Sequence, residues 1–291
     1  DTRITLTSYL IILSTMMYNT DGQEKLDTIR VSLFQTDIIW ENKSANLISL
    51  YEELKKLSGL TDIVILPEMF STGFSMNSHT LAEPITGNTI SLLQQWASTF
   101  QLAIVGSYIA VDGTKKTPQE QKFYNRGFFI TPEKKTFYYD KRHLLRMGSE
   151  PDSFDSGNQR TLISYRGWNI CLLVCYDLRF PVWSRNVNNE YDLLIYVANW
   201  PESRRQVWDV LLQARALENM SYVCGVNRIG KDGNYIRYNG GSALYSSKGE
   251  IIYKCVDNKE EVSTVKIDLS SLRQFRKKFP AWKDADHFTI D

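Results

Sequence analysis

Cys175 is the residue whose type and position most directly offer chemistry. It follows the apolar stretch 170–174 and precedes a polar segment in which a helix is expected to begin. A thiol on a sharp turn at the end of a buried strand can act as a nucleophile, and the backbone N–H groups beside it can face an oxyanion. The alternative is structural, because an isolated cysteine is most often a small buried hydrophobic residue.

Two charged residues follow apolar strands earlier in the chain. Glu68 ends the apolar run 62–66, and Lys141 follows the strand-like residues 136–139. Taken alone, Glu68 indicates a strand-end charge that faces solvent, and Lys141 indicates an ordinary basic loop. Taken with Cys175, the carboxylate can accept the thiol proton and the ammonium can stabilise an oxyanion. A free thiol, with a pKa of ~8.5, needs such a base. The pattern predicts attack on a carbonyl or nitrile carbon, with no histidine required.

The three segments that carry these residues resemble the signatures of the nitrilase, or carbon–nitrogen hydrolase, superfamily. They are residues 66–70 (LPEMF), 139–144 (YDKRHL) and 174–181 (VCYDLRFP), and the resemblance extends from residue 26 to the C-terminus. It implies that Glu68, Lys141 and Cys175 form a Glu-Lys-Cys triad. It also implies an α/β fold, a four-layer αββα sandwich with two mixed β-sheets. The family usually forms homodimers or higher homo-oligomers that continue the sandwich across the interface.

The resemblance adds further site candidates. Glu150 matches a second glutamate that many members carry beyond the lysine, where it would orient Lys141 or the substrate; otherwise it is a loop charge. Asn199 and Trp200 follow the next strand, where the family places pocket-lining groups. They are otherwise a strand-end cap and a core aromatic residue. The backbone N–H of Tyr176 is the expected second oxyanion donor.

Within the superfamily, segments 70–74, 177–181 and 198–201 look most like the omega-amidase branch. That resemblance implies hydrolysis of small 2-oxo dicarboxylic acid monoamides, such as 2-oxoglutaramate and 2-oxosuccinamate, to ammonia and the 2-oxo acid. Arg179 would bind the substrate carboxylate through its bidentate fork, unless it forms a structural salt bridge at the helix start. Aromatic candidates for the pocket walls are Phe74, Tyr108, Phe123, Tyr124 and Trp200.

Two other classes of function remain open at this stage. One is a different carbon–nitrogen hydrolase, namely a nitrilase, a carbamoylase or an aliphatic amidase, because all of these pass through similar cysteine adducts. The other is a non-catalytic binding protein on the same fold. If Cys175 failed to react with a small alkylating agent near neutral pH, that result would favour the non-catalytic binding protein.

Composition excludes several partners and cofactors. The 291 residues carry a net charge of +1, which gives no electrostatic case for nucleic acid or an anionic membrane. Four cysteines, three histidines and no CxxC pair make a zinc site unexpected. Cys171 and Cys175 would lie about 13 Å apart on one strand, too far for a disulfide. The low cysteine content fits a reducing compartment, so we expect a cytoplasmic location. We expect no cofactor or metal, because the nucleophile, base and oxyanion donors are all in the chain, and the resemblance implies a small-molecule amide substrate.

Strand and helix patterns alternate from residue 26 to residue 291, which we assign to one hydrolase domain. Residues 1–25 are assigned to a non-core extension, whose apolar stretch 6–18 is too short to span a bilayer. Strands are expected at residues 29–35, 62–66, 103–108, 124–131, 136–139, 168–175, 193–198, 222–227, 242–245, 251–255 and 263–267. Helices are expected at residues 40–58, 91–100, 182–188 and 208–219.

Overall fold

The first sheet of the computed structural model has six strands in the order β14-β1-β2-β3-β4-β5. The structure describes residues 27–112 and 121–289. β1, β2 and β3 run parallel, and the other neighbours in this sheet are antiparallel. The strands are β1 (Thr28–Gln35), β2 (Ile63–Ile65), β3 (Ala103–Val111), β4 (Phe123–Ile130), β5 (Thr136–Asp140) and β14 (Glu261–Asp268). The carboxyl ends of β2 and β3 therefore lie at the same edge.

The second sheet also has six strands, in the order β13-β12-β9-β8-β7-β6. Its centre is parallel, from β7 through β8 to β9, and its outer pairs are antiparallel. The strands are β6 (Leu162–Tyr165), β7 (Trp168–Val174), β8 (Leu193–Ala198), β9 (Tyr222–Asn227), β12 (Ala243–Tyr245) and β13 (Ile251–Lys254). Both sheets are mixed, as expected for the predicted fold class.

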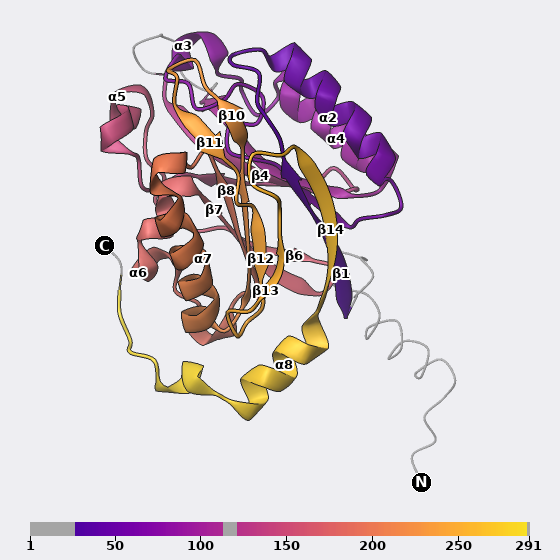
Figure 1. The fold of residues 1–291 in the computed structure, drawn as a ribbon, viewed down its shortest axis with the longest axis vertical. Coiled ribbons are helices and arrows are strands. Elements are labelled where there is room, and N and C mark those ends of the chain that lie inside the picture. Colours follow the sequence, from indigo (N-terminus) through magenta and orange to yellow (C-terminus); the bar gives the residue numbers. More distant parts are fainter. Residues whose placement is uncertain (1–26, 113–120, 290–291) are drawn as a thin grey trace.

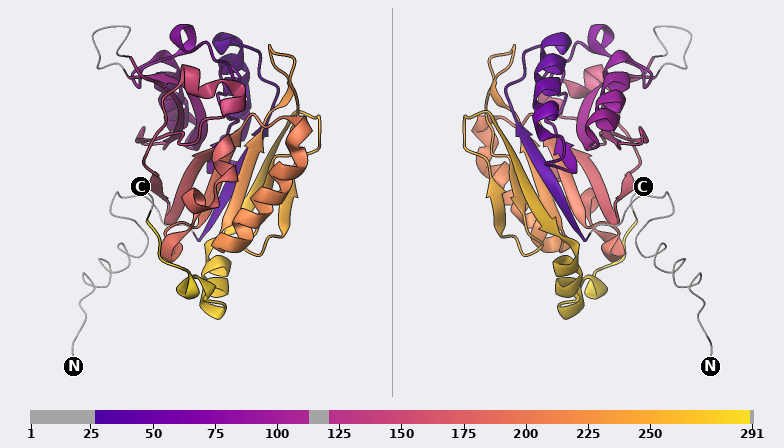
Figure 2. Two further views of the ribbon diagram at one scale, coloured as in Figure 1. Left: turned by 90° about the vertical axis from the view of Figure 1, so that its left-hand side faces the viewer. Right: turned by 90° about the vertical axis from the view of Figure 1, so that its right-hand side faces the viewer.

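The two sheets pack face to face, and helices cover their outer faces (Figures 1 and 2). α2 (Lys43–Leu57) and α4 (Asn88–Phe100) cover the first sheet, while α6 (Pro181–Ser184) and α7 (Arg205–Asn219) cover the second. α7 approaches β9 closely because Gly225 has no side chain; a Cβ there would lie 2.7 Å from the Trp208 ring. These four layers confirm the predicted αββα sandwich.

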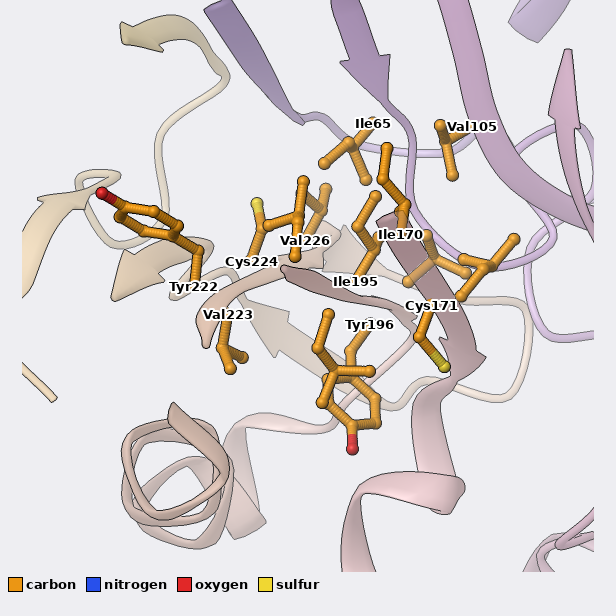
Figure 3. Close-up of a cluster of buried hydrophobic side chains, with 14 of the residues drawn as sticks. Ile65, Val105, Ile170, Cys171, Ile195, Tyr196, Tyr222, Val223, Cys224 and Val226 are labelled. Carbon is orange, nitrogen blue, oxygen red and sulfur yellow. The ribbon is translucent and has the colours of Figure 1, made fainter. Parts of the chain in front are cut away.

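The core between the sheets follows the two-residue alternation of the strands. Ile65 and Val105 of the first sheet point toward Ile170 and Ile195 of the second, whereas Tyr196 points to the opposite side (Figure 3). Residues of the other parity on the first sheet form a separate core with α2 and α4. Residues on both faces of the central strands are therefore buried, which explains their nearly continuous apolar sequences.

Several elements were absent from the sequence prediction. The most prominent is α8 (Leu269–Lys278), whose side chains are largely charged and which follows the strand that we ended at residue 267. β6 and the hairpin of β10 (Ile229–Lys231) with β11 (Arg237–Asn239) were also missed, because their apolar runs are short. The remaining short α-helices of the described residues are α3 (Ser78–Leu81) and α5 (Glu150–Ser153). The predicted extension lies outside the described residues, so its assignment stays a prediction.

Candidate active site

Four strands of the two sheets end around one buried site. Glu68 lies three residues beyond β2, and Lys141 directly follows β5, so both come from the first sheet. Cys175 directly follows β7, and Asn199 directly follows β8 of the second sheet. The face-to-face packing of the sheets thus brings together residues that are up to 131 positions apart, as in the pair Glu68 and Asn199.

Glu68, Lys141 and Glu150 form a buried ion cluster. Lys141 Nζ donates to Glu68 Oε1 at 3.0 Å and to the Glu150 oxygens at 2.8 and 2.9 Å. None of the three side chains is more than 1% exposed. The backbone N–H of Leu145 also donates to Glu150 Oε2, at 2.7 Å. Glu150 is therefore a member of the cluster rather than the exposed loop charge that the sequence left open.

Asn125 of β4 joins the two carboxylates and was missed by the sequence analysis. Its Nδ2 donates to Glu68 Oε1 at 2.7 Å and to Glu150 Oε1 at 3.1 Å. The residue is fully buried, and its backbone C=O accepts from the N–H of Lys141 at 3.0 Å. The signal available in the sequence was a polar residue within the strand 124–131, with aromatic residues around it.

Glu68 is also held from the second sheet. The N–H of Asn199 donates to Glu68 Oε2 at 2.8 Å, and the Asn199 side chain donates to the Glu68 backbone C=O at 2.6 Å. Asn199 therefore holds Glu68, the candidate base, in place. This role is closer to the predicted pocket-lining function than to a strand-end cap. Glu68 Oε1 has two donors, Lys141 and Asn125, whereas Oε2 has the single donor Asn199.

Cys175 occupies a strained turn. Its φ is +44°, in the left-handed region that residues with a side chain rarely adopt, and Met69 beside Glu68 has a φ of +45°. Such strain persists only where the surroundings enforce it and is concentrated at functional sites. The Cys175 side chain is 7% exposed, and its Sγ lies 3.9 Å from the backbone oxygen of Asn199.

The charges of the cluster shift the titration of its members. Burial raises the pKa of the Cys175 thiol well above its ordinary value; the Glu68 charge adds to the shift and Lys141 opposes it. Burial lowers the pKa of Lys141, but Glu150 and Glu68 outweigh it and raise that pKa. Burial also raises the pKa of Glu150 despite Lys141. At neutral pH the site therefore holds a protonated thiol and a charged ammonium.

Asp177 fastens the turn that carries Cys175 to the segment that carries Lys141. Its Oδ2 accepts from the N–H of Val174 at 3.0 Å and from the Tyr139 hydroxyl at 2.7 Å. Its Oδ1 accepts from the N–H of His143 at 3.1 Å and contacts His143 Nδ1 at 2.8 Å. Four donors thus face one fully buried carboxylate, which fixes the turn relative to the end of β5.

A small inner cavity lies against Cys175. It measures about 20 Å³, room for about one water molecule, and Lys141, Phe74, Tyr176, Asn199 and Trp200 are among its lining residues. A wider outer cavity of about 750 Å³ adjoins it. The residues that line both cavities are Leu145, Tyr176, Arg179 and Arg204.

The cavities bring together the binding residues that the sequence predicted. Phe74, Tyr176, Arg179, Asn199 and Trp200 all line the inner cavity. The guanidinium of Arg179 lies 5.4 Å from the centre of the Trp200 ring and 6.0 Å from that of the Tyr176 ring. Within the described residues no carboxylate is paired with Arg179, so the structural salt bridge considered for it is not found there.

Three of the predicted wall residues line neither cavity, and one cation was missed. Tyr108 and Tyr124 line neither cavity among the described residues, and the same holds for Phe123. Tyr108 is buried in the core beneath α4, and Phe123 packs with Met69 in a separate cluster. Their strands were placed correctly, but a sequence does not reveal which face of a strand borders a cavity. Arg204, which lines both cavities, carried no signal beyond its charge.

The described part of the chain contains no group of three or more His, Cys, Asp or Glu side chains that is arranged to hold a metal ion. In residues 27–112 and 121–289, no helix is both long enough and apolar enough to cross a membrane.

Comparison with known proteins gives consistent matches over the described fold. A family model described as "Carbon-nitrogen hydrolase" matches residues 30–277. Omega-amidase YafV of Escherichia coli K12 is 39% identical over 264 residues, covering 90% of this chain and 98% of that protein. A 2-oxoglutaramate amidase of Bacillus subtilis is 27% identical over 257 residues, covering 87% and 96% respectively.

A solved structure gives the same result. XC1258 of Xanthomonas campestris, described as a CN-hydrolase superfamily protein with an arsenic adduct in its active site, is 37% identical. It superposes with a TM-score of 0.85 and covers 91% of this chain and 99% of its own. Nit3 of Saccharomyces cerevisiae, at 22% identity and a TM-score of 0.77, shares the fold.

Proposed function

The chain belongs to the carbon–nitrogen hydrolase family and is a cysteine amidohydrolase, and from this premise we propose that it acts as an omega-amidase. Its substrates are small 2-oxo dicarboxylic acid monoamides, with 2-oxoglutaramate and 2-oxosuccinamate as the leading candidates. The products are ammonia and the 2-oxo dicarboxylate. The resemblance to an omega-amidase at 39% identity and to a 2-oxoglutaramate amidase supports this choice.

The acylation step starts from a protonated thiol. Because burial and the Glu68 charge raise the pKa of Cys175, the thiol keeps its proton until a base removes it. Glu68 Oε2 accepts that proton as Sγ attacks the amide carbon, because Oε1 already accepts two hydrogen bonds. Lys141 and the N–H of Tyr176 stabilise the oxyanion of the tetrahedral intermediate.

Collapse of that intermediate breaks the C–N bond. Protonated Glu68 donates its proton to the leaving nitrogen, ammonia departs, and Cys175 retains the acyl group as a thioester. A water molecule then attacks the thioester carbon while Glu68 accepts one of its protons. The carboxylic acid leaves, the proton returns to the thiolate, and the site is restored with Glu150 and Asn125 still holding Lys141 and Glu68.

The observation that carries the substrate class is the pair of arginines at the junction of the two cavities. The inner cavity has room for about one water molecule, so only the amide end of a substrate reaches Cys175. The remainder must lie beyond Arg179 and Arg204, which line both cavities. Guanidinium groups bind carboxylates through paired hydrogen bonds, so an amide with a carboxylate a few bonds away fits this site.

The direct test is ammonia release from 2-oxoglutaramate and 2-oxosuccinamate, compared with aliphatic nitriles, carbamoyl amino acids and glutamine. We expect kcat/KM to be highest for the two 2-oxo acid amides. Preference for nitriles or carbamoyl compounds would replace the proposal with one of those activities. Absence of turnover with every compound, together with Cys175 that resists alkylation, would favour a non-catalytic binding protein.

The first mutational test is the exchange Arg179→Ala. Loss of a charged hydrogen-bond partner worth about 1.5–3 kcal/mol raises KM for the carboxylate-bearing amides by about 10–100-fold. KM for a neutral amide of similar length, such as butyramide, should change far less. Steady-state kinetics with both substrates measure the difference, and an equal effect on both would show that Arg179 is not the carboxylate partner.

A further inference from the structure

The outer cavity carries more positive charge than one carboxylate needs. Besides Arg179 and Arg204, it is lined by Arg142, His143 and Arg146. In the described part of the chain, no aspartate or glutamate lines it. A cavity of about 750 Å³ with basic groups of this density and low-dielectric walls concentrates anions.

Acidic residues that lie close to this wall in the chain do not line the cavity. Asp152, Asp155 and Glu202 neighbour lining residues in the sequence but are not among them. Asp177 is fully buried beneath the wall and accepts hydrogen bonds from Tyr139, Val174 and His143. Glu150 is equally buried and is paired with Lys141. Among the described residues, the ionisable side chains that line the outer cavity are therefore all basic.

Two of the three outer basic groups are held in place by aromatic rings. The guanidinium of Arg142 lies 4.4 Å from the centre of the Trp183 ring. The His143 ring stacks on Phe180 with centroids 3.7 Å apart and planes 7° apart, and its Nδ1 contacts Asp177. Arg146 is exposed on the short 3₁₀ helix Arg146–Gly148. Side chains that are already held in place lose little conformational entropy when an anion binds.

We propose that the outer cavity is an anion-binding vestibule, in which Arg142, His143 and Arg146 draw small carboxylates toward Cys175 ahead of neutral molecules of the same size. This inference rests on the proposed function in one respect only, namely that Cys175 is the reactive group that the vestibule serves. It extends that function by giving residues outside the inner cavity a part in selecting anionic over neutral amides.

Two alkylating agents of nearly equal size test the vestibule without any assumption about the substrate. Iodoacetate is an anion and iodoacetamide is neutral, and both form a thioether with a cysteine while iodide departs. Second-order rate constants for Cys175 are measured by peptide mass spectrometry, because Cys171, Cys224 and Cys255 are also present and are buried. The quantity compared is the ratio of the iodoacetate rate to the iodoacetamide rate.

In the wild-type protein we expect this ratio to fall at least about fivefold between about 10 mM and about 500 mM NaCl, because salt screens the attraction. The double exchange Arg142→Ala with Arg146→Ala should lower the ratio at low salt by a similar factor and flatten its salt dependence. Arg273→Ala serves as the matched control. Arg273 is an exposed arginine of α8, at the end of the molecule away from α5 (Figure 1).

The vestibule proposal is overturned if the ratio of the two rates does not change with salt. It is also overturned if Arg273→Ala lowers that ratio as much as the double exchange does. Where the double variant fails to fold by circular dichroism, the single exchange Arg146→Glu at the exposed position gives the same comparison, and there the ratio should fall further. Failure of the proposed function is scored separately. If the proposed function is wrong, the ratio still depends on salt but no amide yields ammonia. If the vestibule proposal is wrong, ammonia release is unaffected but the ratio does not depend on salt.

Discussion

At the scale of single residues, the two oxygens of Glu68 have different surroundings and therefore different roles. Oε1 accepts hydrogen bonds from Lys141 and Asn125, and Oε2 accepts one from the backbone of Asn199. A carboxylate oxygen accepts about two hydrogen bonds, so the open position on Glu68 is on Oε2. This asymmetry assigns proton exchange with Cys175 to Oε2 and orientation to Oε1.

The exchange Glu68→Gln should move activity and thiol reactivity in opposite directions. Without the carboxylate no base remains, so kcat for amide hydrolysis falls at least about 100-fold. The Glu68 charge helps to raise the pKa of Cys175, so its removal lowers that pKa and shifts the midpoint of Cys175 alkylation to lower pH. Ammonia release and the pH dependence of iodoacetamide labelling measure the two effects.

Cys175→Ala is the reference variant for that experiment, since it should show neither turnover nor labelling at this position. Near-normal turnover in Glu68→Gln would transfer the role of base to Glu150, which shares Lys141 and Asn125 with it.

The exchange Asn125→Ala removes one donor from both carboxylates. Glu150, whose pKa burial already raises, loses a hydrogen bond that favours its charged form, so it becomes protonated at a higher pH and the acid limb of the kcat profile moves to higher pH. A hydrogen bond to a charged group is worth about 1.5–3 kcal/mol, which corresponds to a fall in kcat of about 10–100-fold. A pH–rate profile distinguishes this from a structural defect. A lower rate with an unmoved acid limb would show that Asn125 only supports packing.

At the scale of elements, the turn after β7 depends on Asp177. This carboxylate accepts the N–H of Val174 at the end of the strand and, at the same time, the hydroxyl of Tyr139 on β5. The strained φ of Cys175 is therefore enforced from both sheets. The distance between the Cys175 thiol and the Lys141 ammonium is therefore set by the hydrogen bonds of Asp177, and not by either strand alone.

The exchange Asp177→Asn should weaken both the fold and the site. An asparagine turns an NH₂ group toward two of the four donors, and the free energy of unfolding falls by about 3 kcal/mol. Because the turn shifts relative to Lys141, kcat falls as well. Chemical denaturation and steady-state kinetics measure the two changes.

Asp192→Asn is the matched control, because Asp192 is nearly as buried and is paired with Arg276 away from the site. Its exchange should cost similar stability and leave kcat unchanged. If both variants keep the wild-type kcat, Asp177 contributes stability alone.

The sequence predicted the strands that carry the chemistry almost to their ends. The expected boundaries of β8 and β9 are those observed, and Glu68, Lys141 and Cys175 converge as the three motifs implied. The residues that were missed, Asn125, Asp177 and Arg204, act through contacts between elements. Periodicity records which face of a strand is apolar, but it does not record which polar side chain a second sheet places opposite. That information exists only after the sheets pack.

At the scale of the whole molecule, α7 presents an apolar strip on the outside of the fourth layer. Val210 is 56% exposed and Leu217 is 52% exposed, and their spacing of seven residues places them on one face of the helix. α6 lies beside α7 (Figure 1), and its residue Val182 is 53% exposed. The family resemblance predicted a homodimer that continues the sandwich, and this outer face is the surface that such a partner would cover.

The double exchange Val210→Glu with Leu217→Glu should therefore convert a dimer into a monomer. Two charges on each subunit would be buried without partners in an isologous interface, which costs several kcal/mol per pair of subunits. Sedimentation equilibrium measures the change. Ile48→Glu on α2 is the control, since Ile48 is 67% exposed on the opposite outer layer and its exchange should leave the assembly unchanged. A wild-type protein that sediments as a monomer would show that there is no such interface. A dimer that persists in the double variant would show that the interface lies elsewhere.

The dimer would matter for the site because α7 packs on β9 beside β8, the strand that leads to Asn199.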